Sequence, residues 1–249
     1  MIVALIRSEI LKTKRSNLVA AIVFFPAFTA FAVGLLQLAY APKTGAEFLF
    51  ALSMRLWALF MLPLMSLAVA TVVSQIEHAD RTWDYVMSQK VNRFAIYSIK
   101  LLIVLACVLC SSFILFVSIA SIELLHSSFQ LYTVLLPMLV KLALNISSVF
   151  FGNLWLCTIQ TWICLRFRTI IPSIIVSAGM LFFGVAGIMI SPLIGRVQFW
   201  MLFIPSVPPY ATISGEIAWR YAIYISVLGG IISFTIMQLS FHQRLSSRS

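Results

Sequence analysis

The chain has few charged residues. Only 10% of its 249 residues are Asp, Glu, Lys or Arg, while 62% are hydrophobic and the mean hydropathy is +1.06. A soluble domain carries about 25% charged and roughly 45–50% apolar residues. The polar side chains are therefore too few to cover a globule in water, which excludes a soluble protein. The composition predicts an integral membrane protein.

Motifs of an enzyme are also lacking. The sequence contains no GxxxxGK[ST] loop to hold nucleotide phosphates, and no HExxH or GxSxG. Glu123 and His126 have the spacing of a metal site in a helix bundle, but such a site needs a second carboxylate–histidine set from another helix. We therefore expect no catalytic residue, no metal and no cofactor in this chain.

Cysteine is scarce, and all four cysteines fall inside apolar runs. Cys107 and Cys110 have the CxxC spacing of redox proteins. An apolar helix gives them no route to the thiolate, and no βαβ pattern surrounds them. The pair indicates packing rather than redox chemistry, and the same holds for Cys157 and Cys164.

Long apolar runs are what the chain has in abundance. A helix needs about 20 apolar residues to cross a bilayer. Six runs reach or exceed that length, which predicts an all-α, single-domain protein (residues 1–249) with six transmembrane helices. The runs cover residues 18–40, 52–74, 94–122, 131–165, 169–190 and 219–239.

The fourth run is too long for one crossing. If Arg166 and Arg168 mark its inner end, a 20-residue span reaches back only to about Asn145. Residues 131–141 are then expected at the outer interface, as a helical extension of the span.

Lysine and arginine set the orientation. Most of them fall in one set of loops, and by the positive-inside rule both termini are cytoplasmic. The net charge of +10 is thereby explained by topology, and it does not indicate nucleic-acid binding. The cytoplasmic set is Arg7, Lys12, Lys14, Arg15, Arg81, Lys90, Arg93, Lys100, Arg166, Arg168, Arg244 and Arg248.

The N-terminal arm, residues 1–17, has an amphipathic pattern. Ile2, Leu5, Ile6 and Ile10 recur at helical spacing, beside a charged side that includes Arg7, Glu9, Lys12, Lys14 and Arg15. The pattern predicts a helix on the inner leaflet, with its basic side toward anionic lipid headgroups. It either anchors the topology or docks another subunit.

The loop of residues 75–93 has a second amphipathic pattern. Apolar residues recur at intervals of three and four, and charged residues lie mostly off that stripe. We expect a short cytoplasmic helix that either rests on lipid or contacts a cytoplasmic partner. The apolar stripe is Ile76, Ala79, Trp83, Val86 and Met87, and the charged residues are Glu77, Asp80, Arg81 and Asp84.

Residues 191–218 hold four prolines around an apolar core, 199–204, that is too short to cross a bilayer. We expect this outer segment to be re-entrant, dipping into the outer leaflet or packing against span ends.

Few polar residues lie within the spans. Ser66, Asn145, Ser148 and Asn153 either line a translocation path or join helices by hydrogen bonds, which is the commoner use of such residues in membranes. No carboxylate or cation lies deep in a span, which argues against a proton relay or an ion-coupled pump. We expect a hydrophobic cargo and an energy source outside this chain.

Two segments resemble a known family: the arm segment SEILKTKRS (residues 8–16) and residues 77–102. The second has an acidic start, a Trp, a short apolar turn, a basic residue, then an aromatic residue and a Lys opening the third span. On these motifs the chain resembles the membrane subunits of type-2 ABC exporters. Its small size and its arm, with Glu9 and Lys12, resemble in particular the permeases of lantibiotic self-immunity and bacitracin-type resistance. The matching residues are Glu77, Trp83, Val86, Met87, Arg93, Tyr97 and Lys100.

The resemblance implies a mechanism shared among several chains. Such permeases pair as dimers, with an identical or a sister subunit, on two ATPase subunits that bind ATP and Mg²⁺. ATPase closure is transmitted through the loop helix, so the resemblance assigns the ATPase contact to Glu77, Asp80, Arg81, Trp83, Asp84, Val86 and Met87. Asp84 departs from the family, which has a basic residue there, so a salt bridge made by relatives would be absent or inverted here.

The resemblance also implies a task. We expect a bacterial inner-membrane exporter of an amphipathic peptide such as a lantibiotic. Two alternatives stay open: an export permease for a drug or lipid, and a membrane sensor or scaffold that transports nothing.

Overall fold

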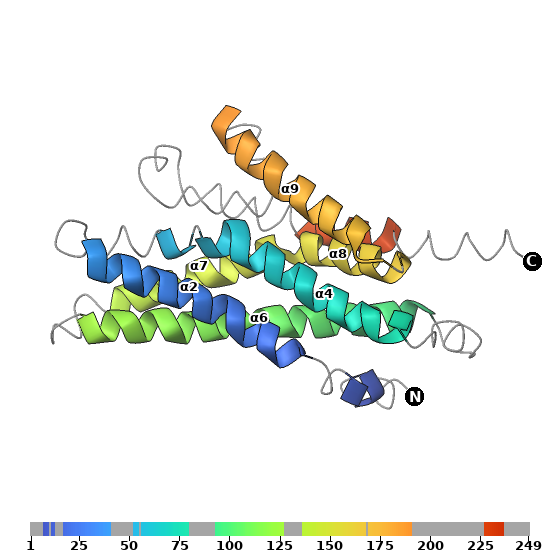
Figure 1. Cartoon of the computed structure of the whole chain (residues 1–249), viewed down its shortest axis with the longest axis horizontal. Helices are drawn as coiled ribbons and strands as arrows, with labels where there is room; N and C mark the ends of the chain where they lie inside the picture. Colours follow the sequence, from blue (N-terminus) through green and yellow to red (C-terminus); the bar gives the residue numbers. More distant parts are fainter. Residues whose placement is uncertain are drawn as a thin grey trace, which may run out of the picture.

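All regular secondary structure that the structure describes is helical, as predicted. The computed structural model describes residues 7–9, 11–12, 17–40, 52–54, 56–79, 93–126, 136–167, 169–190 and 227–236. The helices are α2 (Leu18–Tyr40), the π-helical turn η1 (Trp57–Met61), α4 (Leu62–Ala79), α6 (Arg93–His126), α7 (Leu136–Gly152), α8 (Leu154–Arg166), α9 (Ile171–Ile190) and a shorter helix, Val227–Ile236 (Figure 1).

Three helical segments are long and apolar enough to cross a membrane: Leu18–Leu36, Leu52–Ile76 and Ala95–Ile122. The bent pair Leu142–Gly152 and Leu154–Arg166 makes a fourth if it counts as one span. The first three segments fall on the first three predicted runs, and the bent pair falls on the C-terminal part of the fourth. Six crossings and the orientation of the termini stay predictions.

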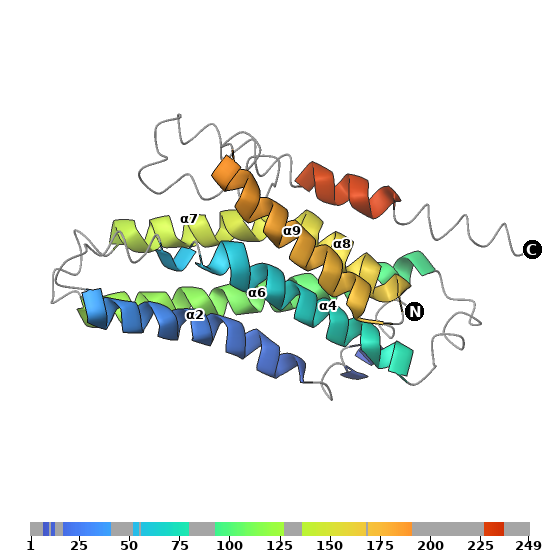
Figure 2. The same ribbon diagram turned by 45° about the horizontal axis from the view of Figure 1, so that its top comes forward.

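Hydrogen bonds fix the relative directions of the helices. Ser66 pairs with Gln160 and Thr71 with Cys164, so α4 and α8 are parallel. Gln160 and Cys164 in turn contact Ser177 and Ser173, so α9 is antiparallel to α8. α9 lies obliquely across α4 and α8 (Figure 2). These directions are those of a chain that crosses alternately up and down.

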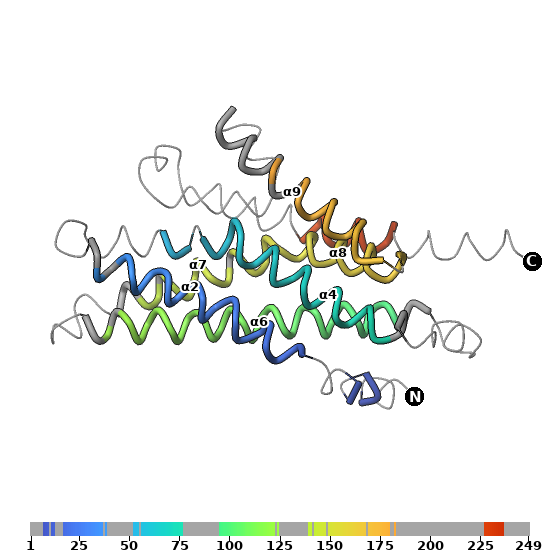
Figure 3. Tube along the Cα trace, in the orientation of Figure 1, coloured from blue at the N-terminus to red at the C-terminus, as the bar shows by residue number. Residues whose placement is uncertain are grey.

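The other side of the bundle is formed by α2 and α6, which pack along each other (Figure 3). Hydroxyl groups within these apolar helices bond back to the carbonyl one turn earlier, as Thr29 does to Phe25 and Ser112 to Val108. This local bonding satisfies hydroxyls where no water can do so.

The helix of the fourth apolar run is bent, a feature that the expected span from Asn145 did not include. α7 and α8 are inclined by 40° at Asn153. The N–H of Asn153 is shared between the carbonyls of Val149 and Phe150, each at 3.1 Å. Gly152 precedes the break, and glycine is a poor helix former because it lacks a side chain to restrict the backbone.

The core and the outer surface are both apolar. Trp57, Leu62 and Met65 are almost completely buried, whereas Phe24 and Phe31 on α2 are 61% and 64% exposed. Rings on such a surface would be costly to hydrate. Lipid removes that cost, so the exposed rings support a membrane protein.

Candidate functional site

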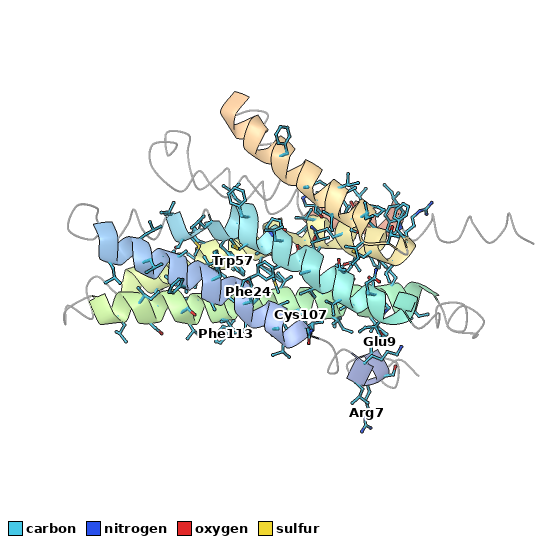
Figure 4. All side chains as sticks on the ribbon, viewed as in Figure 1. Arg7, Glu9, Phe24, Trp57, Cys107 and Phe113 are labelled. Carbon is cyan, nitrogen blue, oxygen red and sulfur yellow. The ribbon has the colours of Figure 1, made fainter. Side chains whose placement is uncertain are left out.

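The N-terminal arm is helical where it is described, at residues 7–9 and 11–12. Arg7 projects away from the bundle, whereas Glu9 projects toward it (Figure 4). Glu9 is only 4% exposed. Glu9 is therefore buried, although the sequence pattern groups it with the charged side of the arm.

Glu9 is buried because it pairs with Lys100 of α6. The Lys100 ammonium lies 3.1 Å from Glu9 Oε2 and donates a second hydrogen bond, also of 3.1 Å, to the carbonyl oxygen of Val73 in α4. Lys100 is completely buried. The other carboxylate oxygen, Oε1, accepts a hydrogen bond of 2.6 Å from Lys12. We call these four residues, Glu9, Lys12, Val73 and Lys100, the arm cluster.

The electrostatics of the arm cluster favour a charged Glu9. Burial by itself raises the pKa of this carboxyl, because it removes water from the carboxylate. The ammonium groups of Lys100 and Lys12 outweigh burial and hold the pKa of Glu9 below its ordinary value. Two cations thus surround one carboxylate, and the cluster is positive overall.

Lys100 is a functional candidate that the positive-inside rule does not single out, because that rule counts it only as one of the cytoplasmic cations. A signal does exist. Ile96 and Val104, one turn before and one turn after Lys100, are both buried, so helical spacing places Lys100 on the buried face of α6. A cation on that face needs a partner, and among the predicted arm residues only Glu9 carries a carboxylate.

The predicted ATPase contact falls almost entirely outside the described residues. α4 continues to Ala79, so the backbone at Glu77 is helical and joined to the second span. The side chain of Glu77 is not described, nor are Asp80, Arg81, Trp83, Asp84, Val86 and Met87. The predicted re-entrant segment, residues 191–218, also lies outside the described residues.

A second polar group, here called the polar seam, joins α4, α8 and α9. Gln160 is its centre. Its Oε1 accepts a hydrogen bond of 2.7 Å from the Ser66 hydroxyl, and its Nε2 donates hydrogen bonds to the Ser177 hydroxyl at 3.0 Å and to the Pro63 carbonyl at 3.3 Å. About one turn along, Cys164 lies 3.7 Å from Thr71 and 3.2 Å from Ser173. Ser173 and Ser177 of α9 could not be identified from the sequence patterns, because they look like ordinary small residues in an apolar run.

The predicted path residues do not share one site. Ser66 is buried in the polar seam. Asn153 is buried at the helix break, where its amide donates to Cys157 Sγ at 3.3 Å and its Oδ1 has no partner among the described residues. Asn145 is half-buried, and the side chain of Ser148 is not described.

Two further expectations concern metals and thiols. Within the described part of the chain, no group of three or more His, Cys, Asp or Glu residues could hold a metal ion. All four cysteines are free, and only Cys110 is exposed.

The apolar helical bundle and its lipid-facing rings define a polytopic membrane protein. The family comparison adds the class. Residues 5–206 match the model of the ABC-2 family transporter proteins, so the chain belongs to this family and is a membrane permease of an ABC transporter. Membership implies an ATP-binding partner subunit. No curated protein and no solved structure matches the chain significantly.

Proposed function

We propose that this permease subunit exports an amphipathic peptide of the lantibiotic type from a bacterial inner membrane. In this proposal the chain crosses the membrane six times, has both termini in the cytoplasm and pairs with a second permease. It carries no catalytic group of its own. A separate subunit binds Mg²⁺ and ATP and hydrolyses the nucleotide.

The observation that carries the proposal is the family match, because it covers most of the arm, the loop of residues 75–93 and the first five apolar runs together. The polar seam supports a route for the cargo that is lined by uncharged polar side chains. Its side chains are hydroxyls, a thiol and one amide, which offer hydrogen bonds without the cost of a buried charge. The Lys100–Glu9 pair lies where α4 ends and α6 begins. This position supports transmission of the ATPase movement to the bundle at the end that carries the loop.

The loop is proposed as the ATPase contact, with Trp83 as its apolar anchor and Glu77, Asp80, Arg81 and Asp84 setting register. Burial of a Trp side chain contributes on the order of a few kcal/mol, so a single residue can dominate such a contact.

Co-purification tests the proposal. The tagged chain is expressed with the ATP-binding subunit of its transporter and purified in detergent. The parental chain should retain that protein, and Trp83→Ala or deletion of residues 77–88 should lose it. Phe113→Ala is the matched control, because it removes an aromatic ring that is 63% exposed on the lipid-facing side of α6. Retention of the ATP-binding protein by both loop variants contradicts the loop assignment.

The cargo is tested in liposomes that contain the purified complex. A lantibiotic should raise the rate of ATP hydrolysis and leave the membrane only when ATP is present. If a lipid or a drug does so instead, the cargo class changes. A complex whose ATP turnover responds to none of these is a sensor or scaffold.

A further inference from the structure

The arm cluster ties together three segments that are far apart in the sequence. Lys100 lies on α6, Val73 on α4 and Glu9 on the N-terminal arm. The ammonium group of Lys100 contacts the other two residues, each at 3.1 Å. The two helices are those that flank the loop of residues 75–93: α4 runs into it and α6 leaves it. The cluster therefore lies at the base of that loop.

Setting the topology does not explain this arrangement. The positive-inside rule requires only that a cation lie on the cytoplasmic side, and an exposed side chain is sufficient. The side chain of Lys12 is 40% exposed and meets that need, whereas the side chain of Lys100 is 1% exposed. Burial of an ammonium is costly, and the cost is recovered only if the partners stay in place.

The partners constrain Lys100 from two directions. A carboxylate attracts the ammonium from the arm, and a backbone carbonyl holds it to α4, so movement of either segment away from α6 leaves a buried charge underbonded. We infer that Lys100 is a positioning residue that holds the arm, the end of α4 and the start of α6 as one rigid unit. The inference rests on the proposed function for its consequence: movement of the loop by the ATPase then moves the arm with both helices.

Spin-label distances in the full chain test the inference without any cargo. One label is placed on Cys110, which is exposed on α6, and the other on Leu11→Cys, whose parent residue is 57% exposed on the arm. The three buried cysteines are replaced by alanine, and labelled chains are diluted with unlabelled ones in lipid nanodiscs. The parental pair should give one narrow distance distribution.

The variants distinguish the positioning role of Lys100 from a general effect of positive charge on the arm. Lys100→Met should broaden the arm-to-α6 distance, and Lys100→Arg should keep it narrow because it retains the charge and the donors. Lys12→Met is the matched control: it removes the other cation of Glu9 and should leave the distribution narrow. If Lys100→Met does not fold, Glu9→Ala frees the arm while leaving Lys100 bonded to α4, and it should broaden the same distance. A narrow distribution in Lys100→Met, or in Glu9→Ala, overturns the inference.

The complex with the ATP-binding subunit tests the consequence. Trapping with ATP and vanadate should leave the parental distance unchanged, because the arm and α6 move together, and should lengthen or spread it in Lys100→Met. A parental distance that changes on trapping overturns the inference. Failure of the ATP-binding subunit to bind the parental chain contradicts the proposed function instead, and leaves the nucleotide-free distances as an independent test.

Discussion

Ser111 of α6 donates a hydrogen bond of 2.9 Å to the carbonyl oxygen of Ile22 in α2. That carbonyl is the one that Pro26 leaves without a helical partner, because proline has no N–H to donate to the residue four positions earlier. Without water in the bilayer, the unpaired carbonyl needs a donor from another helix. A proline in one span is thus compensated by a serine in a neighbouring one.

Replacement of Ser111 by alanine should lower the free energy of unfolding by about 1 kcal/mol, because the Ile22 carbonyl loses its donor. In a Pro26→Ala background the same change should cost less than about 0.5 kcal/mol, since the restored N–H of residue 26 then bonds this carbonyl. Unfolding in mixed micelles with increasing SDS measures both. Ser118→Ala is the control, because Ser118 bonds within its own helix. Equal costs in the two backgrounds would show that Pro26 and Ser111 are not coupled.

Gln160→Leu should destabilise the bundle by about 1–3 kcal/mol, since it leaves Ser66 and Ser177 without their shared partner in a buried site. The same unfolding assay measures the effect, and limited proteolysis should show α9 cut earlier. Ser121→Ala, which removes an exposed hydroxyl bonded within α6, should change stability by less than about 0.5 kcal/mol. A Gln160→Leu chain as stable as the parent would mean that the polar seam does not hold α9.

Gly230 lies against α8, and a Cβ there would be 3.6 Å from the backbone nitrogen of Trp155. Alanine fits at that distance, so Gly230→Ala should be tolerated, while Gly230→Leu should push the helix of residues 227–236 away from α8. A disulfide or chemical cross-link between the two helices would report the separation. Gly34→Leu is the control, because nothing lies within 4 Å of a Cβ at Gly34. Equal cross-linking in Gly230→Leu and the parent would contradict the packing.

The lowered pKa of Glu9 predicts a pH-dependent stability. The carboxylate is favoured in the folded chain by Lys100 and Lys12, so its contribution is fully present above the ordinary value of 4.5 and is lost as the pH falls through the lower folded pKa. The stability gap between the parent and Glu9→Gln should therefore stay constant from neutral pH to about pH 5 and close below it.

Unfolding curves across that pH range measure the gap. Lys12→Met should keep most of the pH dependence, because Lys100 still pairs with Glu9. A gap that does not change with pH would show that folding leaves the pKa of Glu9 at its ordinary value, and a gap that grows as the pH falls would show that the carboxyl is neutral in the folded chain.

The sequence alone determined the class of fold and the first four helical runs. Their approximate bounds can be predicted because a crossing needs about 20 apolar residues and the few charged residues mark where a run can end. α2 follows the first predicted run from Leu18 to Tyr40. The break at Asn153 could not be predicted from the sequence, because a Gly–Asn pair inside an apolar run fits a straight helix as well as a bent one.

The tertiary structure decided which polar residues meet. Gln160 and Ser177 lie 17 positions apart, and Glu9 and Lys100 91 positions apart, so only the packing of the helices brings each pair together. Composition shows that ionisable groups are rare in this chain. Packing shows that one of them, Lys100, is buried, because a carboxylate and a carbonyl from two other segments take the place of water.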